Sequence, residues 1–146
     1  MKVFVYFNLH KKLWSIKALE GERKGKVIGH QHNVVLKRCT FKVSEAGRQR
    51  VLREKKKNVH AGIVGHFDVF ATQPTGLAIP IVYNPYKFKT FVVNTDWNGM
   101  GEWVEVHYAD QVSMVANDIS GAQVHGFDIV TDLSMWLNKK NDKVAT

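Results

Sequence analysis

Two short stretches each place a histidine beside a Phe-Asp pair within an apolar run. They are Val64-Gly65-His66-Phe67-Asp68-Val69 and, about sixty residues later, Val124-His125-Gly126-Phe127-Asp128-Ile129. If they form neighbouring strands, His66 and His125 could supply the base and the acid for metal-independent phosphodiester cleavage, with a Lys or Arg on the phosphate. Neither copy has the His-x-Thr or His-x-Ser pattern usual for that chemistry, and histidines satisfied within a core are commoner. A nuclease or phosphodiesterase is therefore kept as an alternative.

The sequence lacks the patterns of several other enzyme classes. It has no phosphate-cradling Gly-rich loop ending in Lys-Ser/Thr, no His-Glu-x-x-His and no nucleophile elbow. We therefore lean toward a protein that is not an enzyme and expect no cofactor.

Histidines also occur at spacings that a metal ion could use. Gly29-His30-Gln31-His32 places two imidazoles on one side of a strand, but no carboxylate follows nearby, so an exposed turn is the better interpretation. The histidine of Glu105-x-His107-x-x-Asp110 could join His125 and Asp128 in a carboxylate-rich site. We favour neither arrangement, so the sequence predicts no metal site.

A basic run between residues 48 and 60 is the best candidate binding site. Its side chains can contact phosphates at the end of a helix and in the loop that follows. They are Arg48, Arg50, Arg53, Lys55, Lys56, Lys57 and His60. Tyr86 and Trp97 lie in turn-like segments and are the best exposed aromatics for stacking on bases, whereas Trp14 and Trp103 are expected in the core. Part of the clustering has a structural explanation, because cations in a last turn complement the helix dipole.

The formal net charge of +8 is unevenly distributed. Residues 1–70 hold 16 Lys/Arg against 5 Asp/Glu, whereas residues 71–146 hold 5 against 8. Such asymmetry favours a polyanionic partner, since clustered cations release the counterions condensed on phosphates. A solvated basic face without a partner is the alternative.

The elements that must position these residues are mostly strands. β-branched and aromatic runs predict a hairpin over residues 2–8 and 13–19, and strands at about 26–29, 33–37, 40–43, 59–70, 79–83, 87–93, 102–108, 111–116 and 122–130. A basic helix is expected near residues 45–56, capped by Ser44, and 132–137 could form a last helical turn. We predict an α+β, mostly β fold: a curled antiparallel sheet or small barrel with one main basic helix, in a single domain of residues 1–146.

The chain has the composition of a cytoplasmic protein. Cys39 is its one cysteine, so neither a disulfide framework nor a Cys-based zinc site is available. There is no signal-peptide core and no stretch near the ~20 apolar residues of a membrane span. We expect a cytoplasmic location and no membrane partner.

The segment from Cys39 to Gly65, with Tyr6 to Ile16 before it, resembles a family of small proteins encoded by tailed bacteriophages, over roughly residues 1–66. No activity is attached to that family. The resemblance implies a role in host takeover or counter-defence, in the host cytoplasm. We therefore predict a basic phage protein that binds a phosphate-bearing ligand, either nucleic acid or a signalling nucleotide. An inhibitor that docks on a host or defence protein is a further alternative, and a homo-oligomer is compatible with each.

Overall fold

The computed structural model describes residues 1–67, 77–96, 98–117, 121–132 and 136–137. Its elements in chain order are β1 (Lys2–Asn8), β2 (Leu13–Ala18), β3 (Val27–Gln31), β4 (Asn33–Val43), α1 (Glu45–Glu54), β5 (Ala61–Phe67), β6 (Ile79–Ile81), β7 (Val92–Asn94), β8 (Trp103–Asn117), β9 (Gly121–Thr131) and β10 (Trp136–Leu137). The fold is mostly β with one helix in the described part, which confirms the predicted class.

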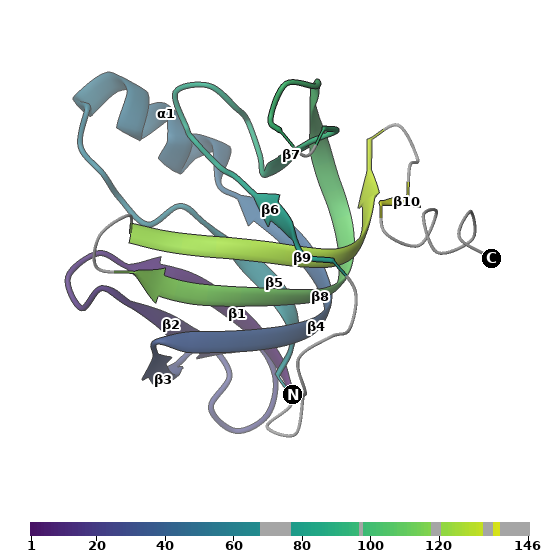
Figure 1. Ribbon diagram of the computed structural model, residues 1–146. Coiled ribbons are helices and arrows are strands. Elements are labelled where there is room, and N and C mark those ends of the chain that lie inside the picture. The colour runs from purple at the N-terminus through teal and green to yellow at the C-terminus, as the bar shows by residue number, and fades with distance from the viewer. Residues whose placement is uncertain (68–76, 97, 118–120, 133–135, 138–146) are drawn as a thin grey trace.

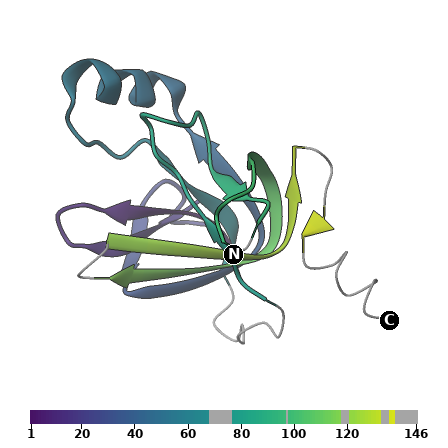
Figure 2. The ribbon, with the colours of Figure 1, turned by 45° about the horizontal axis from the view of Figure 1, so that its top comes forward.

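The strands form a curled antiparallel sheet that does not close into a barrel (Figures 1 and 2). Its order is β10-β9-β8-β4-β5-β1-β2-β3, while β6 pairs with β9 and β7 pairs with β8. The central strand β4 therefore joins a half made of β1, β2, β3 and β5 to a half made of β8, β9 and β10. Helix α1 connects β4 to β5 and stands off one end of the sheet (Figure 1).

One face of the sheet carries the core, because side chains alternate between the two faces of a strand. In β1, Val3 and Val5 are fully buried, while Lys2 and Phe4 lie on the opposite face. The other strands add core residues that include Ile16, Leu36, Ile63, Val112, Met114 and Ile129. We call the face opposite this core the outer face.

Two expected strand breaks lie within longer strands. The predicted strands 33–37 and 40–43 are both parts of β4, which bulges against β5 where Arg38 has a φ of 52°. Likewise 102–108 and 111–116 both belong to β8, whose register against β9 shifts at His107. The break expected at residues 38–39 is thus a bulge rather than a loop, whereas residues 109–110 continue β8 without one.

The predicted helix is confirmed with a slightly earlier end. Ser44 is its N-cap, and its Oγ accepts the Gly47 N–H at 3.2 Å. The helix stops at Glu54 because Lys55 adopts a left-handed conformation, with φ 56°, and bonds its N–H to the Val51 carbonyl. The expected helical turn over 132–137 is wrong for residues 136–137, which pair with β9 as a short strand.

Gly62 in β5 generates a first prediction. A Cβ placed there would lie 2.5 Å from both Cζ of Phe4 and the carbonyl oxygen of Val5, whereas a Cβ at Gly29 would meet nothing within 4 Å. We expect Gly62→Ala to lower the free energy of unfolding by about 1–3 kcal/mol through overpacking, and Gly29→Ala to leave it nearly unchanged. Urea denaturation of both variants measures the difference, and equal stability would contradict the close packing of Phe4 over β5.

Candidate nucleic-acid interface

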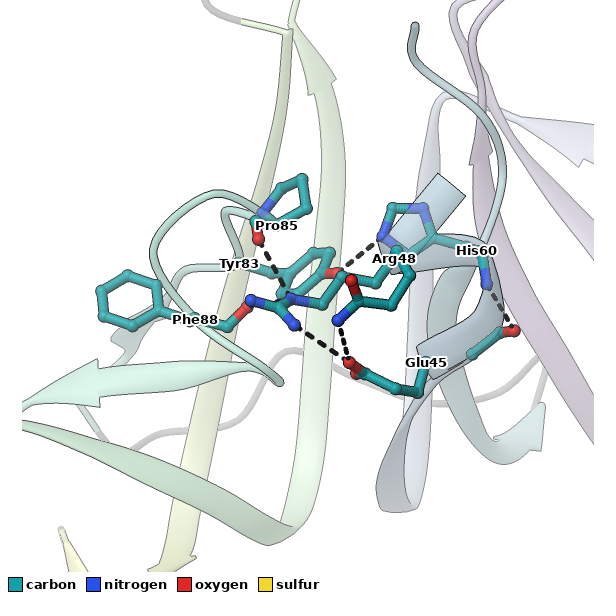
Figure 3. Close-up of polar contacts among 9 residues, drawn as sticks. Glu45, Arg48, His60, Tyr83, Pro85 and Phe88 are labelled. Carbon is teal, nitrogen blue, oxygen red and sulfur yellow. Dashed lines mark hydrogen bonds and ion pairs between the residues drawn. The ribbon is translucent and has the colours of Figure 1, made fainter. Parts of the chain in front are cut away.

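The predicted basic run is divided between structural and exposed roles. Arg48 faces inward, with its Nε 3.0 Å from the carbonyl oxygens of both Pro85 and Phe88 and its Nη1 3.1 Å from Glu45 Oε1 (Figure 3). Its guanidinium therefore fastens the 85–88 turn to the helix. The Gln49 amide, and then the Arg48 guanidinium, lower the pKa of Glu45, which keeps this ion pair charged at neutral pH.

His60 is also held by neighbouring residues. Its Nε2 lies 2.6 Å from the Tyr83 hydroxyl and its Nδ1 lies 2.9 Å from Asn58 Oδ1 (Figure 3). Burial raises the pKa of Tyr83 to about 12, so the hydroxyl keeps its proton at neutral pH and can donate it to Nε2. The arrangement in which Nε2 accepts from Tyr83 and Nδ1 donates to Asn58 satisfies both contacts.

The other cations of the run lie on the surface. Arg50 forms an exposed pair with Glu54 at 3.2 Å. Arg53 and Lys55–Lys57 are exposed and form no ion pair within the described residues. This part of the predicted site is open to a ligand, although it surrounds the negative end of the helix dipole.

The predicted burial and exposure of the aromatic side chains are confirmed in part. Trp14 is buried as expected, and Tyr86 is exposed by 58%. Trp103 is exposed by 46% and packs on Phe88, so its expected place in the core is wrong; it begins β8 facing away from the buried Val104. Trp97 lies outside the described residues.

The two histidine strands are not neighbours, so the arrangement expected for His66 and His125 is wrong. β4 and β8 separate β5 from β9. Three strand spacings of roughly 4.8 Å put the two backbones on the order of 14 Å apart, too far for both imidazoles to reach one phosphate. His66 lies instead between Lys2 and Lys37, and His125 lies between Ser113 and Pro80.

The sequence did not reveal a cluster of cations and rings on the outer face of β1, β2, β4 and β5. Residues paired across neighbouring strands lie on the same face of a sheet. The register therefore places two rows of side chains on the outer face: Lys2–His66–Lys37 and Lys17–Phe4–Val64–Thr40. Lys42, opposite Gly62, lies on the same face. We define the basic sheet face as Lys2, Lys17, Lys37, Lys42 and His66 with the rings of Phe4 and Tyr6. The two rings lie 5.9 Å apart with a 33° tilt.

No strand from β1 to β5 contains an Asp or Glu. A carboxylate does reach the margin of the face, where Glu20 accepts the backbone N–H of Lys2 at 2.8 Å. Lys2, Lys37 and Lys42 are exposed, while Lys17 is half-buried. The alternation of Lys2, Phe4 and Tyr6 with buried valines was the signal in the sequence that could have identified this face.

A hollow adjoins the basic sheet face at its Lys42 end. It has a volume of about 590 Å³ and shares Phe4 and Lys42 with that face, and Val64, which pairs with Phe4, also lines it. Its other lining residues are Leu19, Phe41, Val43, Ser44 and His60. Its walls are mostly apolar, and His60 is the residue of the predicted run that reaches it.

The histidines considered as metal ligands have separate environments. His30 Nδ1 lies 2.8 Å from the Ser15 hydroxyl. His107 Nε2 lies 2.7 Å from Asp132 Oδ1, and Glu105 belongs to the same group. The partner of the Glu105–His107 pair is thus Asp132 rather than the Asp110, His125 and Asp128 considered from the sequence.

A family model described as the Mycobacterium phage L5 gene 82 protein matches residues 1–121. The chain belongs to this family. A curated relative, the gene 82 protein of Mycobacterium phage L5, is 45% identical over 98 residues, which cover 63% of this chain and 77% of the relative. No solved structure matches. The phage family expected from the first 66 residues is therefore confirmed over a longer stretch.

The match to the gene 82 family contains the whole basic sheet face and all of α1, whereas Asp132 lies beyond it. Among the described residues of this family member, no helix is long and apolar enough to cross a membrane.

The inward position of Arg48 leads to a second prediction. Arg48→Ala should lower the free energy of unfolding by about 1.5–3 kcal/mol, because it removes hydrogen bonds from a charged donor to two carbonyls. Arg50→Ala, which removes only an exposed i,i+4 pair, should cost less than about 0.5 kcal/mol. Chemical denaturation compares the two, and an Arg48 variant that keeps full stability but loses ligand affinity would show that the guanidinium serves binding.

Proposed function

We propose that this phage protein binds single-stranded nucleic acid across the basic sheet face. The observation that carries the proposal is the gathering of four lysines, one histidine and two aromatic rings on paired strands that contain no carboxylate. A role in host takeover or counter-defence forms part of the proposal and rests on the phage family.

Electrostatics favours a polyanion here. Lys2 and Lys37 lie on one face of the sheet on either side of His66, so their positive charges repel each other across two strand spacings. Phosphates bound across this row would offset the repulsion and would release counterions from the nucleic acid. Among the described residues no ion pair involves Lys2 or Lys37, and the nearby Glu20 accepts the backbone N–H of Lys2.

The rings favour a single strand over a duplex. Phe4 and Tyr6 are half-buried on β1 and lie between the lysines of β2 and β4. Unpaired bases can stack on such rings while the phosphates meet the flanking cations. A duplex has its bases stacked inside and would offer this face only its backbone.

The helix end is then an extension of the interface. Arg53 and Lys55–Lys57 follow the strand that carries Lys42, and the hollow that Lys42 lines also contains Ser44 and His60. A signalling nucleotide, the other ligand expected from the sequence, would occupy this hollow rather than the length of the sheet. The two ligands are distinguished by testing long and short oligonucleotides alongside mononucleotides and cyclic dinucleotides.

The lysines of the sheet give a third prediction. Lys37→Gln with Lys42→Gln should weaken binding of a labelled single-stranded oligonucleotide and flatten the plot of log affinity against log salt by about 1.4, since each phosphate contact contributes roughly 0.7 for a single strand. Fluorescence anisotropy at several salt concentrations measures both quantities.

The matched control removes the same charge from the helix end, with Arg53→Gln and Lys56→Gln. We expect this double variant to change the salt slope by less than the sheet variant does. A larger effect of the helix-end variant would place the interface at the basic run predicted from the sequence. If neither variant changes binding, both candidate sites are rejected.

The stacking contribution gives a fourth prediction. Tyr6→Ala should weaken binding of the oligonucleotide by about 1–3 kcal/mol, the range for one base–aromatic stack, whereas Tyr6→Phe should retain most of the affinity. Titration with an abasic oligonucleotide provides the comparison, because it keeps the phosphates and lacks the bases. Equal affinity of the two Tyr6 variants would show that the face binds backbone alone.

A further inference from the structure

We propose a second site, for a divalent transition-metal ion, formed by Glu105, His107 and Asp132. The ligand atoms of the three side chains all lie within 4.8 Å of one another. The site is carried by β8 and the residue after β9, neither of which contributes to the basic sheet face.

The backbone pairing of β8 and β9 assembles the group. The Asp132 N–H donates to the Glu105 carbonyl at 2.9 Å, so the ladder between the strands continues to this point and sets the two carboxylates opposite each other. His107 stands at the register shift between Val106 and Tyr108. Its Nε2 approaches Asp132 Oδ1 to 2.7 Å. The irregular strand thus directs an imidazole to a pair of carboxylates, in keeping with the use of bulges to aim side chains at functional sites.

The donors and their spacing suit one ion. Nitrogen and oxygen ligands lie about 2.0–2.2 Å from zinc, so ligands of a shared ion are at most about 4.4 Å apart. The three ligand atoms lie within 4.8 Å of one another, so a side-chain shift of about half an ångström brings them within reach of one ion. Imidazole together with carboxylate is typical of zinc or manganese, whereas calcium and magnesium prefer oxygen ligands alone. The His107 and Asp132 side chains are exposed by 52% and 58%, so water could complete the coordination shell.

The charge balance favours an ion over an ordinary His–Asp pair. Two carboxylates and one imidazole lie within 4.8 Å of one another, and two negative charges this close are unfavourable. Within the described residues no Lys or Arg forms an ion pair with Glu105 or Asp132. The half-buried Glu105 carboxylate also accepts no hydrogen bond from any residue that the structure describes. A bound dication would neutralise this excess, which the histidine alone does not.

The proposal departs from the sequence expectation of no metal site. Asp132 lies about 25 residues from His107, and only the pairing of β8 with β9 shows that they meet. Glu105 and His107 fall within the residues matched by the gene 82 family model, and Asp132 falls outside them.

The test begins with calorimetric titration of the full chain with zinc and, separately, with manganese. We expect one site, and we expect His107→Ala and Glu105→Gln each to weaken it at least about tenfold, because even residues that only support metal ligands contribute 10- to 100-fold. His32→Ala is the matched control, since it removes an exposed histidine outside the group and should leave the affinity unchanged. Equal weakening by the control, or unchanged affinity in both site variants, would overturn the assignment.

A measurement on the unaltered protein keeps the test valid if a variant fails to fold. Manganese should broaden the amide NMR signals of residues 105, 107 and 132 at concentrations that leave those of residues 30 and 32 sharp. Broadening centred on the other histidines, or no broadening at millimolar manganese, would reject the site.

Discussion

The two-residue alternation of an antiparallel strand is the constraint on which this structure depends. Val3 and Val5 must face the core, and this requirement places Lys2, Phe4 and Tyr6 on the other face whatever their own preferences. The same holds in β5, where Ile63 is buried toward the core and His66 lies on the outer face. A slip of one residue would bury the lysines, so the core that stabilises the register also assembles the proposed interface.

Register shifts in the two long strands β4 and β8 allow them to bend around that core. Arg38 takes a positive φ where β4 shifts against β5, and Cys39 just beyond it is fully buried. Burial raises the pKa of the Cys39 thiol to about 12, which keeps it neutral and suited to the core. The second register shift, at His107, lies in the part of β8 that precedes Ala109, where its pairing with β4 begins. The Glu105–His107–Asp132 group lies at this second register shift.

Local patterns in the sequence predicted the hairpin of β1 and β2, the Ser44 cap and the helix, because each depends on residues close along the chain. They could not predict that β4 and β8 would separate His66 from His125, since strand order depends on packing between distant segments. The basic run was found from composition, but composition could not show that Arg48 turns inward to the carbonyls of Pro85 and Phe88. The lysines of the sheet were missed for the opposite reason: they are scattered in sequence from Lys2 to Lys42 and are gathered only by register.

The helix end and the sheet offer an anion different fields even though both carry four cations. Arg53 and Lys55–Lys57 surround the C-terminus of α1, where unpaired carbonyls form the negative end of the dipole and already attract those cations. Strand dipoles alternate in an antiparallel sheet and largely cancel, so Lys2, Lys17, Lys37 and Lys42 face no such opposing field. Equal numbers of charges therefore do not make equal sites, because the dipole offsets about half a unit charge at the helix end and no comparable field opposes the lysines of the sheet.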